Sequence, residues 1–322
     1  MSLTNVQVGA WNIIGQEPFA MRGRHFFVDS VRGSDSWPGT SWAQAKKTIW
    51  GTTGGYSLLT TGMNDVLHLA GNATAYSCAA VAPWAKDFTH MIGHTAPIRT
   101  GGRVRLTNTV TTATAGEWTI SGTGCIFQNI HWQWGASATA TSVIGVALSG
   151  NGRNSFINCQ FEGPTNATVA GGTAIAPVML TATADNLFQG CAFGGDTAIS
   201  NSAAGTVILF AGANNNRNVF RDCIITHYNS TTTSSSVLMG ANAMSTACWT
   251  LFDNCIFQHS AGVAVASTLQ MVTGEGALII KACALTGKGI AVWTATGDAS
   301  KTQIEIINPL GAATGGLGVH IA

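Results

Sequence analysis

A cysteine flanked by apolar residues returns at a fixed interval in the centre of the chain, and this interval constrains the fold more than any other feature. The motif reads FINCQF, FQGCAF, FRDCII and FDNCIF, and its cysteines are spaced by 32 residues: Cys159, Cys191, Cys223 and Cys255. Apolar and polar residues alternate within each copy, as they do in a β-strand. The fixed period and the abundant Gly, Asn and Thr predict stacked β-coils of about 32 residues.

Two flanking copies of the motif extend the series. FQNIHW places Ile130 in the cysteine position, and IKACAL places Cys283 there. Equivalent side chains of successive coils lie one strand spacing apart, about 4.8 Å. We therefore expect one inward core column of small apolar side chains, with free thiols: Ile130, Cys159, Cys191, Cys223, Cys255 and Cys283. A metal or redox ladder is the weaker alternative, because the sequence contains no C-x-x-C pair.

The same register predicts polar columns on the outside of the coils. Arg153, Asp185 and Arg217 are 32 residues apart and form an expected charge ladder of alternating sign. A second charge pair and an asparagine column are expected inside the motif, from Arg221 with Asp253 and from Asn158, Asp222 and Asn254. Such ladders set the register of the coils more than they stabilise them.

The composition limits the classes of partner. Of the 322 residues only 9% are charged, against about 25% in a typical soluble domain, and the net charge is +1. This balance favours neither nucleic acid nor an anionic membrane as a partner. The start of the chain, MSLTNVQVGA, lacks the basic and apolar regions of a secretory signal. We therefore expect synthesis in a cytoplasm, with reduced cysteines.

The segment Gly39–Trp50, GTSWAQAKKTIW, predicts a short amphipathic helix that caps the first coil. Ser41 and Gln44 fit a capping box. Trp42, Ala45 and Ile49 would share one helical face.

A family resemblance starts in the same region. The stretches FFVDSVRGSDSWPGTSWAQAKKTI, NDVLHLAGNATAY and HMIGH resemble, in order and spacing, the first coils of right-handed parallel β-helix proteins of the pectate-lyase-like superfamily. With the cysteine motifs, the resemblance covers roughly residues 26–310. It implies an all-β, right-handed, single-stranded parallel β-helix. It implies little about function, because this scaffold carries lyases, hydrolases, virion spikes and structural proteins alike.

We divide the chain into four parts. Residues 1–25 form an extended docking arm with apolar Trp11, Ile13, Ile14 and Phe19, which either lies on its own solenoid or reaches a neighbouring subunit. Residues 26–60 contain the first strand and the capping helix. Residues 61–310 form the β-helix, and residues 311–322 are a Gly-rich, uncharged tail.

Candidate catalytic residues are few. By the family resemblance, a lyase would need acidic residues for Ca²⁺ with a Lys or Arg base, and a hydrolase two or three Asp. The repeats are poor in acid, and Glu162 with Asp196 is the nearest approach to a pair. His227 and His259 share a column, but no third metal ligand falls in register with them. The sequence therefore predicts no catalytic, cofactor-binding or metal residue.

Three function classes stay open. The favoured class is a non-enzymatic structural protein of a bacteriophage virion, such as a capsid decoration or cement protein, which forms a homotrimer and contacts the major capsid protein or other virion proteins. The second is a tail spike or fibre that binds or cleaves host glycan, with sugar stacking on Trp132, Trp134, Trp249 and Trp293. The third is a polysaccharide lyase.

Overall fold

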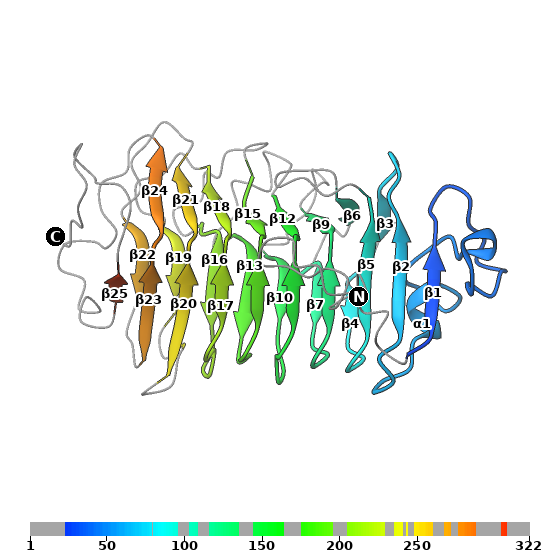
Figure 1. Cartoon of the computed structure of the whole chain (residues 1–322), viewed down its shortest axis with the longest axis horizontal. Coiled ribbons are helices and arrows are strands. Elements are labelled where there is room, and N and C mark those ends of the chain that lie inside the picture. Colours follow the sequence, from blue (N-terminus) through cyan, green and yellow to red (C-terminus); the bar gives the residue numbers. More distant parts are fainter. Residues whose placement is uncertain are drawn as a thin grey trace, which may run out of the picture.

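The chain forms a parallel β-helix in which three sheets run the length of the molecule. The computed structural model describes residues 23–78, 80–95, 103–108, 116–134, 144–163, 175–195, 205–228, 235–240, 243, 248–259, 267–271, 276–287 and 304–307. Figure 1 shows the strands side by side along the long axis, from β1 at one end to β25 at the other. The expected docking residues and the C-terminal tail lie outside the described residues.

From β2 to β22 each described coil contributes one strand to each sheet, always in the same order. In the described residues, sheet 1 has ten strands: β1 (His25–Val28), β2 (Val66–Ala70), β5 (His90–His94), β8 (Ile126–Gln128), β11 (Ser155–Ile157), β14 (Leu187–Gln189), β17 (Val219–Arg221), β20 (Trp249–Asp253), β23 (Ala277–Lys281) and β25 (Ile304–Ile307). Its neighbouring strands pair in parallel.

The other two sheets complete the coil. Among the described residues, sheet 2 has eight strands: β3 (Tyr76–Cys78), β6 (Val104–Asn108), β9 (Ile130–Gln133), β12 (Gln160–Glu162), β15 (Ala192–Phe193), β18 (Ile224–His227), β21 (Ile256–His259) and β24 (Ala284–Gly287). Sheet 3 has seven described strands: β4 (Ala82–Trp84), β7 (Trp118–Ile120), β10 (Ile144–Leu148), β13 (Ala176–Thr181), β16 (Ile208–Ala211), β19 (Ser235–Met239) and β22 (Ser267–Met271).

The 32-residue interval is one coil, as the cysteine spacing predicts. Phe156 pairs with Phe188, Phe188 with Phe220, and Phe220 with Phe252 on adjacent strands of sheet 1. Their rings stack in the core with centroids 4.7, 4.6 and 4.5 Å apart. Stacked aromatic rings at this spacing add to the free energy of burial, so the column stabilises the coil register.

The bend between sheets 1 and 2 explains the residue type that precedes each position of the cysteine column. The residue before the cysteine has a positive φ in every coil described here: Asn129 (57°), Asn158 (51°), Gly190 (62°), Asp222 (54°), Asn254 (54°) and Ala282 (50°). Asn, Asp and Gly tolerate this left-handed conformation best. Asn254 also donates a hydrogen bond to Asp222 at 2.7 Å, which confirms the asparagine column.

A buried asparagine ladder closes the opposite bend, at the start of the sheet 1 strands. Asn154, Asn186 and Asn218 are at most 1% exposed. Asn186 Oδ1 accepts the Asn154 N–H at 3.1 Å, and Asn218 Oδ1 accepts both the backbone N–H and the side-chain Nδ2 of Asn186, at 3.1 and 2.8 Å. Each side chain thereby satisfies backbone donors of the adjacent coil that would otherwise be buried without a partner.

The predicted capping helix over residues 39–50 is wrong. The segment contains only a 3₁₀ turn, η3 (Trp42–Gln44), and Ser41 makes no side-chain cap. In the described residues the single α-helix is α1 (Gly55–Leu58). The segment is extended because it covers the edge of β1: Phe27 N donates to Gly39 O, Lys46 N to Phe27 O, and Asp29 N to Lys46 O, each at 2.8 Å. An edge strand needs such backbone partners, and a helix would withhold them.

Candidate functional site

The described coils contain one cavity that involves a predicted histidine. Strand pairing places His227 beside His259, which confirms their shared column. By the same register Gly163 and Gly195 precede them, and Trp134 precedes the glycines. The two glycines allow close packing: a Cβ on Gly163 would come within 2.5 Å of the Trp134 ring, and one on Gly195 within 2.8 Å of Glu162 Cγ. A small hollow remains beside them at the bend from sheet 2 to sheet 3.

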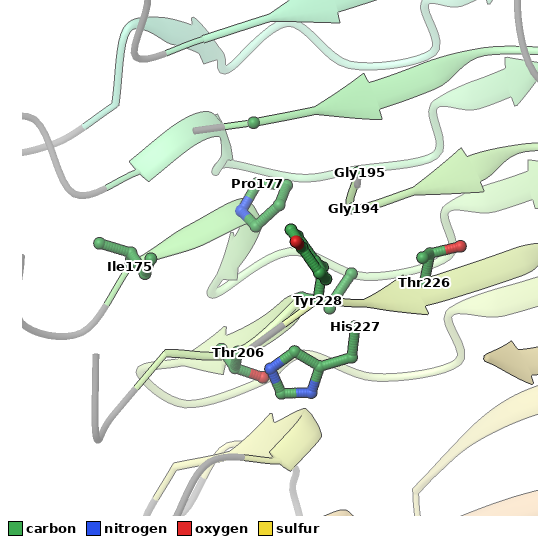
Figure 2. A pocket seen from close by; sticks show the side chains of 10 residues that line it. Ile175, Pro177, Gly194, Gly195, Thr206, Thr226, His227 and Tyr228 are labelled. Atoms are coloured by element: carbon green, nitrogen blue, oxygen red, sulfur yellow. The ribbon is translucent and has the colours of Figure 1, made fainter. Parts of the chain in front are cut away.

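This cavity has a volume of about 310 Å³, including space open to solvent. Figure 2 shows His227, Thr206 and Tyr228 around it, with Gly194 and Gly195 on the neighbouring strand. Ser236 Oγ lies 3.4 Å from His227 Nδ1 and 3.3 Å from His259 Nε2, so one hydroxyl joins the two rings. The space inside it that a water-sized sphere can reach is only about 20 Å³. This is room for about one water molecule and not for a ligand.

Both histidines are neutral near pH 7. Burial, together with a smaller effect of the neighbouring His259, lowers the pKa of His227 to about 3. Burial likewise lowers the pKa of His259 to about 4. In the part of the chain that the structure describes, no group of three or more His, Cys, Asp or Glu side chains has the arrangement of a metal site.

A carboxylate–imidazole pair lies on the outer face of sheet 2. Glu162 Oε2 is 2.6 Å from His131 Nε2, and both side chains are 12% exposed. Gln160 Nε2 donates to Glu162 Oε2 at 3.4 Å, and Arg103 Nη1 donates to Gln160 Oε1 at 3.4 Å. Sequence reasoning placed Glu162 in a pair with Asp196 instead, and Asp196 lies outside the described residues. His131 was missed because it falls in the irregular coil with Ile130 in the cysteine position.

The predicted core column lies inside the coils. Ile130 and the five cysteines Cys159, Cys191, Cys223, Cys255 and Cys283 are at most 1% exposed, and the cysteines are free thiols. Each thiol donates a hydrogen bond to a phenylalanine carbonyl of the preceding coil: Cys191 to Phe156 at 3.3 Å, and Cys223 to Phe188 at 3.5 Å. Burial raises the pKa of Cys159 and Cys223 well above that of an ordinary thiol. A small apolar residue with a weak donor fits this position.

One charge column lies on the bend before sheet 1, and the other lies at the last residues of the sheet 1 strands β17, β20 and β23. Arg217 Nε and Nη2 donate to the two carboxylate oxygens of Asp185 at 2.7 and 2.9 Å, and this contact lowers the pKa of Asp185. Arg153 is the next residue along this column and also lowers the Asp185 pKa by its charge. The second pair is confirmed: Arg221 lies 3.3 Å and Lys281 3.5 Å from Asp253.

The tryptophans offered for sugar stacking do not have that role in the described coils. Trp132 and Trp134 are 2% and 1% exposed and belong to the core. The Trp132 ring stacks on Phe161 at 4.9 Å, because aromatic residues extend a second inward column through sheet 2. Trp249 is partly buried on β20, and Trp293 lies outside the described residues.

Sequence reasoning missed a chain of three histidines on the outer face of sheet 1. His25 Nδ1 lies 2.8 Å from His68 Nε2, and His68 Nδ1 lies 2.7 Å from His94 Nε2. Trp42 of the covering segment packs edge-on against His94, with ring centroids 5.3 Å apart. Burial lowers the pKa of His68 to about 3, helped by His94 and His25. The chain was missed because the first coils do not follow the 32-residue interval.

An apolar stripe on the outer face of sheet 3 was also missed. Val178, Leu180 and Phe210 point into the core, so the residues between them point outward. Strand pairing aligns these outward residues in one column: Thr119, Ala147, Met179, Leu209, Leu238 and Gln270. Met179 and Leu209 are partly buried and pack against a small cluster of their own that includes Ala147. None of the six carries a charge.

No protein-family model matches the sequence, and no curated protein matches it. Solved structures do. The pectin methylesterase of Aspergillus niger is similar over 90% of this chain and 86% of that enzyme, with 14% identity and a TM-score of 0.50. A rhamnogalacturonan lyase is similar over 93% of this chain and 90% of its own, with 12% identity and a TM-score of 0.50. ORF18 of Geobacillus virus E2 is similar over 79% of this chain and 55% of the viral chain, with 10% identity and a TM-score of 0.44.

These likenesses define the class of the protein by its fold. The chain is a parallel β-helix of the kind seen in pectin methylesterases and pectate-lyase-like proteins. At 12–14% identity the likeness concerns the fold alone, and folds of this class carry unrelated functions. The likeness to the viral protein is weaker, with a TM-score of 0.44, and indicates nothing about function. In the described residues no helix is long and apolar enough to cross a membrane.

Proposed function

We propose that this chain is a non-enzymatic structural protein that assembles on a particle, most specifically a decoration or cement protein of a bacteriophage virion. The observation that carries the proposal is the uncharged apolar stripe of Ala147, Met179, Leu209 and Leu238 along the outside of sheet 3. Ala147 is buried, and Met179, Leu209 and Leu238 are partly exposed. The continuity of this partly exposed stripe over several coils supports contact with another protein. The stripe supports a partner that is a second copy of the chain, in a homotrimer, or a neighbouring virion protein.

The carboxylates of the described coils support a structural role as well. Asp65 accepts hydrogen bonds from Arg24 and from the Thr60 backbone, and Asp29 from Arg32 and Asn72. Asp35 holds the backbone of Lys47 and Thr48 at 2.9 Å. Asp65 and Asp29 thus join parts of the first coils, Asp35 holds the covering segment, and Asp185 and Asp253 join successive coils.

The proposed route to the particle is the N-terminal arm, residues 1–25. Burying Ile13 and Ile14 on a partner would each contribute roughly 1.5–3 kcal/mol, and Trp11 adds a larger apolar surface. The proposed location is the virion, assembled in the host cytoplasm, with the major capsid protein as a partner. The proposal includes no cofactor, and neither nucleic acid nor a membrane is a partner.

Deletion of residues 1–22, which leaves Arg24 and His25 of the first coil in place, tests this route. The shortened protein is expected to keep the β-rich circular dichroism and cooperative melting of the full chain, but to fail to co-sediment with particles. A Trp11→Ser, Ile13→Ser chain of full length is the matched control for the loss of apolar surface without the loss of length. Normal particle binding by the shortened protein would contradict the proposal.

A glycan-binding or glycan-cleaving spike is the second candidate, and the Glu162–His131 pair favours it. The Glu162 carboxylate lies beside the His131 imidazole on the outside of sheet 2, and both side chains are largely buried. Such a pair has the groups that general acid–base catalysis uses. Under this alternative, Glu162→Gln abolishes cleavage of a host polysaccharide while it leaves the fold intact. Under the structural proposal, the wild-type protein shows no turnover on a panel of neutral and acidic polysaccharides.

A further inference from the structure

The bend before sheet 1 is a column of residues in the left-handed conformation. The position two residues before the first paired residue of each strand has a positive φ in six described coils: Asn64 (55°), Phe88 (49°), Gly124 (68°), Arg153 (59°), Asp185 (59°) and Arg217 (53°). Asn and Gly adopt this conformation readily, and Asp also tolerates it. Phe88 is the one aromatic residue in the column.

Phe88 lacks the burial that would offset this conformation. A bulky residue in the left-handed region is strained and persists only where the surrounding structure fixes its conformation. The ring is nevertheless 46% exposed. It lies over Gly124, where a Cβ would come within 2.7 Å of Phe88 Cε1, so a side chain at that position would displace the ring.

Met63, on the neighbouring coil, is a second exposed apolar residue at this bend. It is 57% exposed, and the two turns are joined by a hydrogen bond from Gly62 N to Asp87 O at 2.9 Å. We call Met63 and Phe88 the corner patch. Its charged neighbour Asp87 accepts a hydrogen bond from Thr123 N at 2.8 Å and is thereby held to the next turn.

The described chain begins beside this patch. Gly23 occupies the same column as Asn64, because His25 pairs with Val66. The contact is close, since a Cβ on Gly23 would lie 1.9 Å from Asn64 O. Gly23 therefore lies beside the turn that carries Met63, with the backbone of Phe88 one coil further, about 10 Å from Gly23 at two strand spacings.

We propose that Phe19 and Met21 of the same chain pack on the corner patch, Met21 against Met63 and Phe19 against Phe88. Four extended residues span up to about 14 Å, enough for Phe19 to reach Phe88. Burial of the ring then offsets the backbone cost at Phe88. This contact goes beyond the particle-docking proposal, because it fixes the direction in which the arm leaves the coils and leaves Trp11, Ile13 and Ile14 for a partner.

Trypsin cleavage after Arg22 in the full-length protein tests the contact without any particle. Phe88→Asn keeps a residue that favours positive φ but removes the ring, and Phe19→Ser removes the other partner. Each variant is expected to raise the cleavage rate at least about tenfold over wild type. The double variant is expected to be no faster than either single variant, because both remove one shared contact. Val81→Ser, an exposed apolar residue at 42% exposure off the patch, is the control and leaves the rate unchanged.

Two results would overturn the proposal. One is a cleavage rate that neither Phe88→Asn nor Phe19→Ser changes. The other is protection that disappears on dilution of the wild-type protein, which would assign the patch to the arm of a second copy. Failure of the arm to bind particles leaves this contact unaffected, so the two proposals fail separately.

Discussion

Acidification is expected to destabilise the protein through histidines that the fold buries in the neutral form. Burial lowers the pKa of His68 and His227 to about 3 and of His90 and His259 to about 4, from an ordinary value of 6.5. The unfolded chain binds protons as the pH falls below 6.5, and the folded protein does not until the pH nears 4, so stability is lost across that window. Between pH 7.5 and pH 5 each such group lowers the free energy of unfolding by about 2 kcal/mol.

His90 provides the sharpest test of this reasoning. The ring is 1% exposed, and its Nδ1 accepts the Ile126 N–H at 3.1 Å, a contact available only to the deprotonated nitrogen. The free energy of unfolding is measured by urea titration at pH 7.5, 6.5, 5.5 and 5 for wild type and His90→Gln. Whatever its stability at pH 7.5, the variant is expected to lose about 2 kcal/mol less than wild type by pH 5. Equal losses in the two proteins would refute the assignment of His90 as a buried neutral group.

Three further predictions concern the columns. Asn186→Ala removes the acceptor of the Asn154 N–H and a donor to Asn218. It is expected to lower the free energy of unfolding by roughly 2–4 kcal/mol without changing the pH dependence of that free energy. A loss below about 0.5 kcal/mol would show that water replaces the ladder. In thiol labelling of the native protein, the partly buried Cys78 and Cys248 react, and the six buried cysteines react only on denaturation; any disulfide would contradict this. A double-mutant cycle on Asp185 and Arg217 is expected to give a coupling free energy of about 0–1 kcal/mol that becomes smaller in 1 M salt. A coupling free energy that does not change with salt would mean that the pair is not exposed to solvent.

The central coils could be predicted from the sequence because their inward side chains repeat strictly. A cysteine column needs one residue type at one position, and the bend before it needs Asn, Asp or Gly, so both leave a clear period. The first coils could not be predicted in this way. Their lengths differ, and the histidines His25, His68 and His94 therefore share no interval along the chain.

Two wrong predictions and one missed feature have a different physical origin. The segment at Trp42 has a helical pattern of apolar residues, but the unpaired edge of β1 takes its backbone as a partner. Trp132 was considered for sugar stacking because tryptophan suits both uses, and only the register shows that it continues the column of Phe161. The stripe of Met179 and Leu209 was missed because outward and inward residues of sheet 3 are both apolar, so no period of two is visible.

The central claim is that sheet 3 presents an assembly surface, and sedimentation equilibrium of the full-length protein tests it most directly. We predict a mass of three chains for wild type at micromolar concentration, and a single chain for Leu209→Glu, which places a charge in the middle of the stripe. Gln258→Glu, which adds the same charge on the exposed outer face of sheet 2, is predicted to stay trimeric. A wild-type protein that sediments as a single chain, or a Leu209→Glu variant that assembles normally, would contradict the account.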